Sequence, residues 1–270
     1  MSKISIIAEI GWNHMGDMSL AEKMIAEAAK NGADIVKFQT WSEQNLKSGP
    51  WDTDGRREIY KKAELTKEKH LHLMYLANQH KVEFLTSIFS LNQLDLIKEL
   101  GIRKIKVPSH EVHNVKLISS LGYYFDKVLV STGAAKWSEV INISQAIEKD
   151  RLVLLHCVST YPCEIENSNL TRINALKELC NEVGYSGHFQ GVEDAFAAIG
   201  MGALYIEKHF TTDNTLPGRD NQFAILPYQL KKIADFRDLF EKMTIDRGLD
   251  HQEKEKDIID NYRGRWNGKN

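Results

Sequence analysis

Eight short runs of apolar and often β-branched residues recur along the chain, and a segment with the periodicity of an amphipathic helix follows each of them. The apolar runs cover residues 4–10, 34–38, 82–87, 103–107, 127–131, 152–157, 183–186 and 203–208. The helical segments lie near residues 19–31, 66–80, 90–100, 114–122, 137–148, 170–181, 191–201 and 227–243. Continuous apolar runs are typical of parallel strands, because helices cover such strands and bury both of their faces. The pattern therefore predicts alternating strands and helices joined by right-handed crossovers.

Eight such units predict an α/β fold whose sheet closes as a (β/α)8 TIM barrel. An open, doubly wound sheet is the competing architecture, but no GxGxxG motif follows the first apolar run. Barrels of this kind commonly occupy about 250 residues as one unit. We therefore expect a catalytic barrel over residues 1–249, followed by a charged helix or tail over residues 250–270.

One polar segment, residues 41–62, interrupts the repeat directly after the second apolar run. The segment is rich in turn-forming residues and contains Trp41 and Trp51. Long loops after barrel strands lie at the mouth of the active site. We therefore expect this segment to be a loop on the catalytic face.

Composition narrows the choice of partners and compartment. The chain carries 35 basic and 37 acidic side chains, a formal charge of −2, so it provides no overall field that attracts nucleic acid. Glu9 interrupts the first apolar run, and no window approaches the ~20 apolar residues of a membrane span, so we expect neither a signal peptide nor a membrane partner. The cytoplasm is the expected compartment. The three cysteines, an odd number without zinc spacing, are expected to be buried thiols: Cys157, Cys163 and Cys180.

The apolar runs end on polar side chains, at the positions where a barrel of this kind forms its catalytic face. A polar group inside an apolar strand carries a desolvation penalty unless it is paired or binds a ligand, so a ring of such groups indicates a site for a charged ligand. Two cations from separate strands, Lys37 and Lys106, with small hydroxyl donors between them, suit a molecule that carries a phosphate and a carboxylate. The rest of the ring comprises Glu9, Gln39, Thr86, Ser109, Ser131, Tyr161, Ser186 and Glu207.

Two histidines, His188 and His209, close the seventh and eighth strands, which are neighbours in a barrel. Both imidazoles can therefore reach one ion, and two histidines with open coordination positions indicate a catalytic metal site. Glu207, two residues before His209, strengthens this interpretation. We expect a divalent metal, with manganese first and magnesium, cobalt or zinc as alternatives, because imidazole favours first-row transition ions. The remaining histidines at strand ends are expected to be structural or supporting: His110, His113 and His156.

Seven motifs follow one another in order between about residue 4 and residue 230. They are EIGWNHMG at 9–16, KFQT at 37–40, LHC at 155–157, YP at 161–162, GYSGH at 184–188, EKHFT at 207–211 and PGRD at 217–220. Together these motifs resemble the sialic acid synthase (N-acetylneuraminate synthase) family, and although each motif is weak alone, the ordered set is highly specific. The resemblance implies a TIM barrel that condenses phosphoenolpyruvate with N-acetylmannosamine or a related amino sugar and releases phosphate. The product would be a nonulosonic acid such as a sialic, legionaminic or pseudaminic acid.

The resemblance also implies a role for each member of the site. His188 and His209 would bind the metal, and Glu207 would lie beside it and the reacting carbons. The phosphoenolpyruvate cradle would comprise Lys37, Thr86, Lys106, Ser109, Ser131 and Ser186. The acceptor sugar would face Glu9, Gln39, Tyr161 and Asp220. Catalysis would use Lys37 and Lys106 to stabilise the departing phosphate, with Glu9 or Glu207 managing protons.

Three departures from the family pattern bear on the substrates. Residues 108–111 read PSHE where the family usually has Gly-Ser-Gly-Glu, which makes the loop stiffer, and Ser159 stands where many members have asparagine. The family normally continues into an antifreeze-like domain that lends an arginine to the sugar site of the partner subunit, whereas this sequence ends at Asn270. We expect the acceptor site to be completed by Arg56 or Arg57 and Trp51 of the 41–62 segment, by a second copy in a homodimer, or by a separate partner that carries the missing domain.

Two other functions remain open from the sequence. A barrel with lysines at strand ends also suits a Schiff-base aldolase acting through Lys37 or Lys106, although the histidine pair argues against it. The other alternative is a non-catalytic partner of a full-length synthase.

Overall fold

The eight predicted strands form one closed, all-parallel barrel. The structure is a computed structural model that describes residues 3–266 and 268 of the chain. The strands are β1 (Ser5–Gly11), β2 (Ile35–Thr40), β3 (Glu83–Ile88), β4 (Lys104–Val107), β5 (Lys127–Ser131), β6 (Leu152–Cys157), β7 (Glu182–Gly187) and β8 (Tyr205–His209). Each strand pairs with its sequence neighbours, and β8 closes onto β1. This confirms the predicted (β/α)8 TIM barrel and excludes the open sheet.

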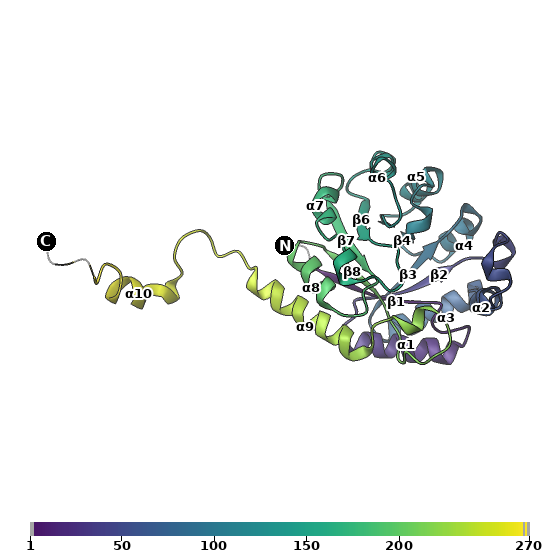
Figure 1. Ribbon diagram of the computed structural model, residues 1–270, viewed down its shortest axis with the longest axis horizontal. Helices are drawn as coiled ribbons and strands as arrows, with labels where there is room; N and C mark the ends of the chain where they lie inside the picture. Colours follow the sequence, from purple (N-terminus) through teal and green to yellow (C-terminus); the bar gives the residue numbers. More distant parts are fainter. Residues whose placement is uncertain (1–2, 267, 269–270) are drawn as a thin grey trace.

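Helices surround the barrel on its outer side (Figure 1). They are α1 (Met18–Lys30), α3 (Lys67–Gln79), α4 (Leu94–Glu99), α5 (Val115–Tyr124), α6 (Trp137–Ser144), α7 (Arg172–Leu176), α8 (Glu193–Gly200) and α9 (Pro227–Met243). α1 begins where the Asp17 side chain accepts hydrogen bonds from the N–H groups of Ser19 and Leu20, which caps the free amides of the first turn. Its buried face, including Met24 and Ile25, packs into the layer between barrel and helices.

The interior of the barrel has an apolar floor below a polar layer. The floor is a separate cluster of buried side chains from successive strands, made of Ile7, Ile35, Leu85, Leu129, Val153, Leu155 and Tyr205. Side chains alternate between the two faces of a strand, so the residue two positions later points into the same space. Those next inward positions include Glu9, Lys37, Ser87, Ser131, Cys157 and Glu207. The period of two therefore places the polar groups at the carboxyl ends of the strands.

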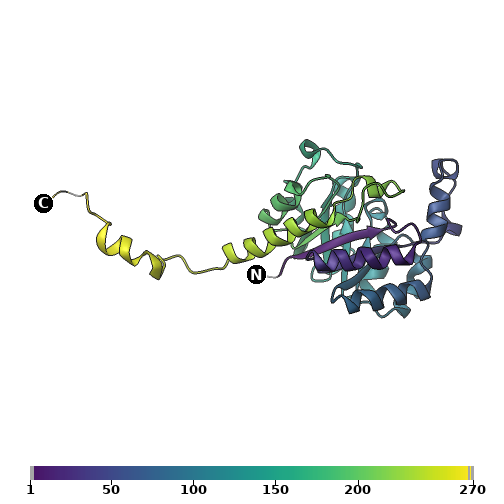
Figure 2. The ribbon, with the colours of Figure 1, turned by 90° about the horizontal axis from the view of Figure 1, so that it is seen from below.

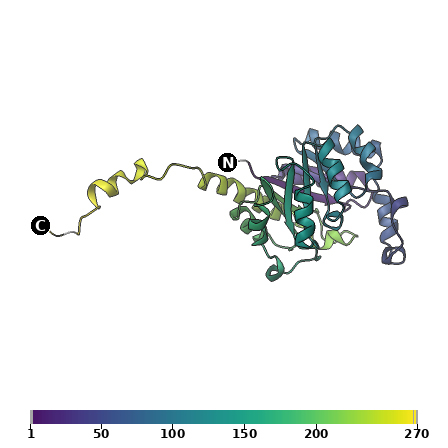
Figure 3. The ribbon, with the colours of Figure 1, turned by 90° about the horizontal axis from the view of Figure 1, so that it is seen from above.

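The segment 41–62 is more ordered than the predicted loop, because it contains α2 (Arg56–Ala63) and two short 3₁₀ turns, Glu43–Asn45 and Pro50–Asp52. Arg57 connects these pieces. It forms ion pairs with Asp52 and Glu43 and donates to the carbonyl of Leu46. Figures 2 and 3 show the segment standing out from the barrel on the side opposite the C-terminal end of the chain.

The C-terminal residues leave the barrel after α9. The chain runs through an irregular stretch to α10 (Lys256–Asn261), which lies apart from the barrel in all three views (Figures 1 to 3). Most of the predicted helix or tail over residues 250–270 is thus described, and residues 267, 269 and 270 fall outside the described residues.

Two expectations from composition concern the described residues as a whole. All three cysteines are free and buried, as predicted. Within the described part of the chain, no helix combines the length and the apolar character needed to cross a membrane.

Candidate functional site

A cavity of about 920 Å³ opens at the carboxyl ends of the barrel strands. A volume of this size accommodates two small substrates together. Of the residues predicted at the strand ends and in the PGRD motif to catalyse the reaction or to bind substrate or metal, all but Thr86 line it: Glu9, Lys37, Gln39, Lys106, Ser109, Ser131, Tyr161, Ser186, His188, Glu207, His209 and Asp220.

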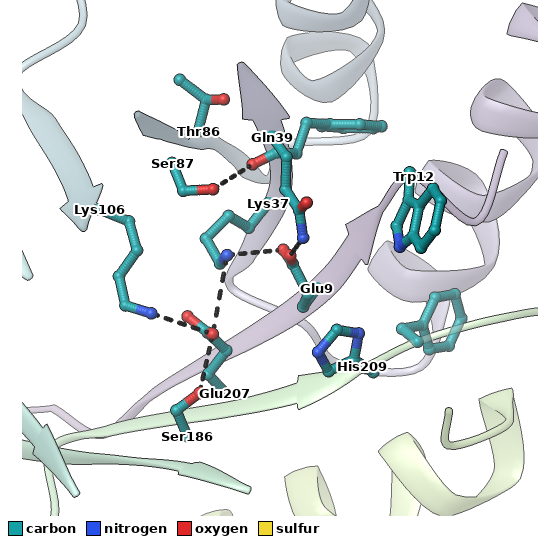
Figure 4. Close-up of polar contacts among 12 residues, drawn as sticks. Glu9, Trp12, Lys37, Gln39, Thr86, Ser87, Lys106, Ser186, Glu207 and His209 are labelled. Carbon is teal, nitrogen blue, oxygen red and sulfur yellow. Dashed lines mark hydrogen bonds and ion pairs between the residues drawn. The ribbon is translucent and has the colours of Figure 1, made fainter. Parts of the chain in front are cut away.

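Two lysines and two glutamates meet at the bottom of the cavity (Figure 4). Lys37 Nζ lies 2.8 Å from Glu9 Oε2 and 3.7 Å from Glu207 Oε1. Lys106 Nζ lies 3.2 Å from the same Glu207 oxygen. Ser186 donates to Glu207 Oε1 over 3.0 Å. All four ionisable side chains are buried, and their charges balance in pairs, which offsets the cost of removing them from water.

The surroundings move the pKa values of the two glutamates in opposite directions. Burial raises the pKa of Glu9, and the Glu207 carboxylate adds to this effect while Lys37 opposes it. Burial alone would also raise the pKa of Glu207, but Lys106 and Lys37 together with the Ser186 hydrogen bond lower it to about 2. Glu207 is therefore the permanent anion of the cluster, and Glu9 is the carboxyl group more able to carry a proton.

The two lysines also differ. The pKa of Lys37 is raised, because Glu207 and Glu9 outweigh the effect of burial. The pKa of Lys106 is lowered, because burial outweighs the attraction of Glu207. An anionic ligand beside Lys106 would restore its preference for the charged form.

His188 and His209 face one another with ring centroids 5.4 Å apart. His188 Nδ1 donates to the carbonyl of Val158 over 2.7 Å, so Nε2 is the nitrogen left to face a ligand. Against the effect of burial, Cys157 and the Val158 hydrogen bond raise the pKa of His188, so a metal ion at Nε2 would take the place of a proton. Burial, with the neighbouring charges of His188 and Lys37, holds the pKa of His209 well below its usual range, so this ring is neutral. His209 Nδ1 is buried without a hydrogen-bond partner in the described chain.

This pair fits a catalytic metal ion better than a structural one. A divalent transition metal binds imidazole through an unprotonated ring nitrogen, which the neutral His209 offers and which His188 would offer on losing its Nε2 proton. Among residues 3–266 and 268, no three or more His, Cys, Asp or Glu side chains gather into a metal site. An ion held by these two histidines would have its other positions open to water or substrate, which is the arrangement of a catalytic centre.

The prediction that Thr86 faces the ligand is wrong. Thr86 lies one position out of phase with Leu85 and Ser87, so it points outward from the barrel. Its hydroxyl lies 2.7 Å from that of Thr40, which in turn lies 2.8 Å from His70 Nε2. Ser87 lines the cavity instead (Figure 4). Counting in twos from the apolar run would have identified it.

Small donors gather around Gly133 at the end of β5. Its N–H donates to Ser109 Oγ over 3.1 Å. A Cβ at Gly133 would meet Ser159 Oγ at 2.2 Å and Cys157 Sγ at 3.0 Å, so only glycine fits. The hydroxyls of Ser131 and Ser159 are buried and have no hydrogen-bond partner among the described residues. Ser131 lines the cavity, so its unpaired buried hydroxyl suits an anionic ligand.

Aromatic side chains line the outer part of the cavity. Tyr161 packs on His188 with ring centroids 4.1 Å apart. Trp12 donates its indole N–H to Asp220 Oδ2 over 2.5 Å, and burial raises the pKa of this carboxyl group. Trp12 belongs to the motif at 9–16, but the sequence pattern alone predicts no role for it.

The 41–62 segment contributes only one of the two predicted arginines. Arg56 lines the cavity beside Trp51, with its guanidinium carbon 5.9 Å from the indole centroid. Arg57 does not line the cavity, because its guanidinium is taken up by Asp52 and Glu43 within the segment. The alternative role predicted for Arg57 is therefore corrected to a structural one.

Of the other three histidines at strand ends, one points away from the cavity and two line it. His156 points outward, where its Nε2 lies 2.7 Å from the carbonyl oxygen of Ser168, so it is structural. His110 and His113 line the cavity, and His110 packs against Phe89 with centroids 5.2 Å apart.

Comparison with known proteins places this geometry among carbohydrate-biosynthesis enzymes. The sequence profile of the NeuB family matches residues 24–246. The chain is 34% identical over 251 residues to N,N'-diacetyllegionaminic acid synthase from Campylobacter jejuni, covering 87% of this chain and 75% of that protein. It is 35% identical over 248 residues to the enzyme of the same name from Legionella pneumophila, covering 85% of this chain and 70% of that protein. The crystal structure of N-acetylneuraminic acid synthetase from Leptospira borgpetersenii in complex with citrate superposes with a TM-score of 0.86 at 32% identity, covering 99% of this chain and 93% of that one.

Proposed function

We propose the activity of this chain from the family to which it belongs, because the chain is a member of the NeuB family. The proposed reaction condenses phosphoenolpyruvate with the open-chain aldehyde of an amino sugar, consumes one water molecule, and yields a nonulosonic acid and phosphate. The observation that carries the proposal is the cavity that contains the Lys37–Lys106 cations, two glutamates and the His188–His209 pair. The names of the relatives, which are synthases of legionaminic and sialic acids, support it.

Phosphoenolpyruvate would occupy the deep end of the cavity. Its phosphate and carboxylate need cations, and Lys37 and Lys106 are the two that lie there, both buried. Ser131, which lines the cavity and whose hydroxyl lacks a partner in the described chain, would donate to its oxygens. Ser87, Ser109 and Ser186 also line the cavity and would surround the same ligand.

His188 and His209 would hold a divalent cation, manganese before magnesium, cobalt or zinc. Such an ion would supply Lewis-acid polarisation of the acceptor carbonyl. Nε2 of His188, which the Val158 bond does not use, and the neutral ring of His209, whose Nδ1 makes no hydrogen bond in the described chain and lies 3.6 Å from Asp220 Oδ2, support this assignment.

Carbon–carbon bond formation would join C3 of phosphoenolpyruvate to the aldehyde carbon. The aldehyde oxygen then gains a proton, and we assign its delivery to Glu9. Burial raises the pKa of Glu9, whereas the lysines hold Glu207 ionised, so Glu9 is the better proton donor of the two. Gln39 Nε2 donates to Glu9 Oε1 over 2.6 Å and would fix the orientation of this carboxyl group.

Water would then add at C2 of the resulting cation and lose its proton to Glu9, which restores the starting state. The tetrahedral intermediate collapses by breaking the bond between C2 and the phosphate oxygen. Lys37 and Lys106 would stabilise the charge that develops on the departing phosphate. Glu207, paired with both lysines, would hold them in position while the bond breaks.

The acceptor would be N-acetylmannosamine or a related amino sugar in the outer part of the cavity. The Tyr161 and Trp12 rings line this part and provide apolar faces for a sugar. The similarity to two diacetyllegionaminic acid synthases favours an acceptor with two acetamido groups.

A second candidate function is that of a Schiff-base aldolase. The lowered pKa of Lys106 favours it, because a lysine that loses its proton more easily is a better amine nucleophile. Borohydride treatment in the presence of pyruvate separates the two reactions. Covalent labelling of Lys106 would favour the aldolase.

The test of the proposed function is to incubate the protein with phosphoenolpyruvate, Mn²⁺ and a panel of amino sugars, and to measure phosphate release and product mass. We expect phosphate release that depends on the acceptor, together with a product heavier than the acceptor by a pyruvate unit. No phosphate release with any acceptor would instead support a non-catalytic partner of a full-length synthase.

A further inference from the structure

Arg219 is an arginine in the cavity wall that makes no ion pair in the described part of the chain. It lies directly before Asp220 and lines the cavity. Its guanidinium carbon is 5.8 Å from the centre of the Tyr161 ring. The other arginine of the wall, Arg56, differs, because its guanidinium pairs with Asp54 over 2.6 Å. Arg219 therefore has donors available for a ligand, whereas those of Arg56 are partly used.

The loop that presents Arg219 is firmly held. Asn221 is fully buried and donates to the carbonyls of Asn13, over 3.1 Å, and Pro217, over 2.8 Å. Gly218 has a φ of +109°, which favours glycine, and a Cβ there would meet Met15 Sδ at 2.8 Å. The backbone position of Arg219 is thus fixed before any ligand binds, which lowers the entropic cost of using it.

Arg219 lies one aromatic ring away from the histidine pair. Tyr161 contacts His188 at 4.1 Å and His209 at 6.3 Å between centroids, and the same ring carries the guanidinium of Arg219. The acceptor aldehyde reacts beside the histidines in the proposed function. A sugar bound there would have room for the rest of its carbon chain over Tyr161, toward the guanidinium.

Phosphoenolpyruvate does not account for Arg219. Its two anionic groups are matched by Lys37 and Lys106, which are 3% and 2% exposed at the bottom of the cavity, whereas Arg219 is exposed at its mouth. A guanidinium presents several donors in one plane, which matches neighbouring hydroxyl and carbonyl oxygens. We propose that Arg219 binds the acceptor by donating to the oxygens of its N-acyl and hydroxyl groups. This inference rests on the proposed function and makes Arg219 a determinant of acceptor recognition.

The test measures acceptor binding without turnover. N-acetylmannosamine and a diacetamido hexose are titrated by saturation-transfer NMR into chelator-treated protein that is saturated with phosphoenolpyruvate. We expect Arg219→Gln to weaken acceptor binding about tenfold, as the loss of a charged hydrogen bond implies, and Arg219→Lys to recover part of it. The affinity for phosphoenolpyruvate should stay at the wild-type value in both variants. Arg265→Gln is the matched control, because Arg265 also stacks on aromatic rings, Tyr262 and Trp266, but belongs to the C-terminal segment and does not line the cavity.

Two results would overturn the inference: wild-type protein that binds neither sugar, or Arg219→Gln protein that binds them as tightly as the wild type. Failure of the proposed function is a separate observation, made with wild-type protein and Mn²⁺. In that case the sugars would bind through Arg219, yet no phosphate would be released from phosphoenolpyruvate.

Discussion

Lys106 on β4 and Glu207 on β8 meet across the inside of the barrel, with Nζ and Oε1 3.2 Å apart (Figure 4). The two strands lie on opposite sides of the closed sheet, and 101 positions separate the residues in the sequence. The ion pair holds the Lys106 ammonium group above the apolar floor, where it can bind an anionic ligand. Because an ammonium group has three N–H donors, a phosphate that binds there would share Lys106 with the Glu207 carboxylate.

Replacing Lys106 should therefore weaken phosphoenolpyruvate binding. In Lys106→Met, the loss of a charged hydrogen bond contributes on the order of 1.5–3 kcal/mol, roughly a ten- to hundredfold lower affinity. Calorimetric titration measures it. Lys104→Met is the matched control, because Lys104 lies on the same strand but pairs with Glu83 outside the cavity. Unchanged affinity in Lys106→Met would remove this lysine from the substrate site.

Ser87 and Thr86 should respond in opposite ways to removal of their hydroxyls. Ser87→Ala should raise the KM for phosphoenolpyruvate, because this side chain lines the cavity. Thr86→Val should leave KM unchanged but lower the free energy of unfolding by about 1 kcal/mol, because the 2.7 Å contact with Thr40 is lost. Steady-state kinetics and urea unfolding of both variants give the two readouts. The reverse pattern would restore Thr86 to the site.

Thr86 and Ser87 also show which features of the barrel can be predicted from the sequence. The apolar runs predict every strand to within two residues at either end, because burial of parallel strands requires apolar side chains along their length. A shift of one residue, however, turns a side chain to the opposite face. Naming Thr86 rather than Ser87 is an error of that kind, although Leu85 on the inner floor indicates the correct phase.

The 41–62 segment marks a different limit. Its α2 helix is strongly polar and buries only Ala63, so the apolar pattern of the sequence does not predict it. The segment is organised by the contacts of Arg57 with Asp52, Glu43 and the Leu46 carbonyl, which depend on the folded positions of all four residues. The sequence likewise does not predict that Arg219 lacks an ion pair in the described chain, because this depends on which carboxylates the fold brings near its guanidinium.

Acid should destabilise the protein through Glu207. The pKa of this group is lowered from 4.5 to about 2 in the folded state, so its stabilising contribution is present above pH 4.5 and is lost as the pH falls toward 2. The contribution at neutral pH is on the order of 3 kcal/mol. Urea unfolding of the wild type and of Glu207→Gln between pH 6 and pH 3 measures the difference, in steps of about 0.5 pH units. We expect the two stabilities to converge as the pH falls, and curves that stay parallel would contradict the assignment.

The histidine pair should decide metal affinity. His209→Ala removes one of the two rings that face each other at 5.4 Å, and an ion held by two protein ligands cannot keep its affinity when one is lost. We expect Mn²⁺ binding, measured by calorimetry or by the electron paramagnetic resonance signal of the free ion, to weaken at least tenfold, in the range that loss of metal contacts produces. His251→Ala is the control, because His251 is exposed in the C-terminal segment. Circular dichroism shows whether the variant is folded, and His188→Ala repeats the test from the neighbouring strand. Folded variants of both histidines that bind Mn²⁺ like the wild type would exclude this pair as the metal site and direct the search to the two glutamates at the bottom of the cavity.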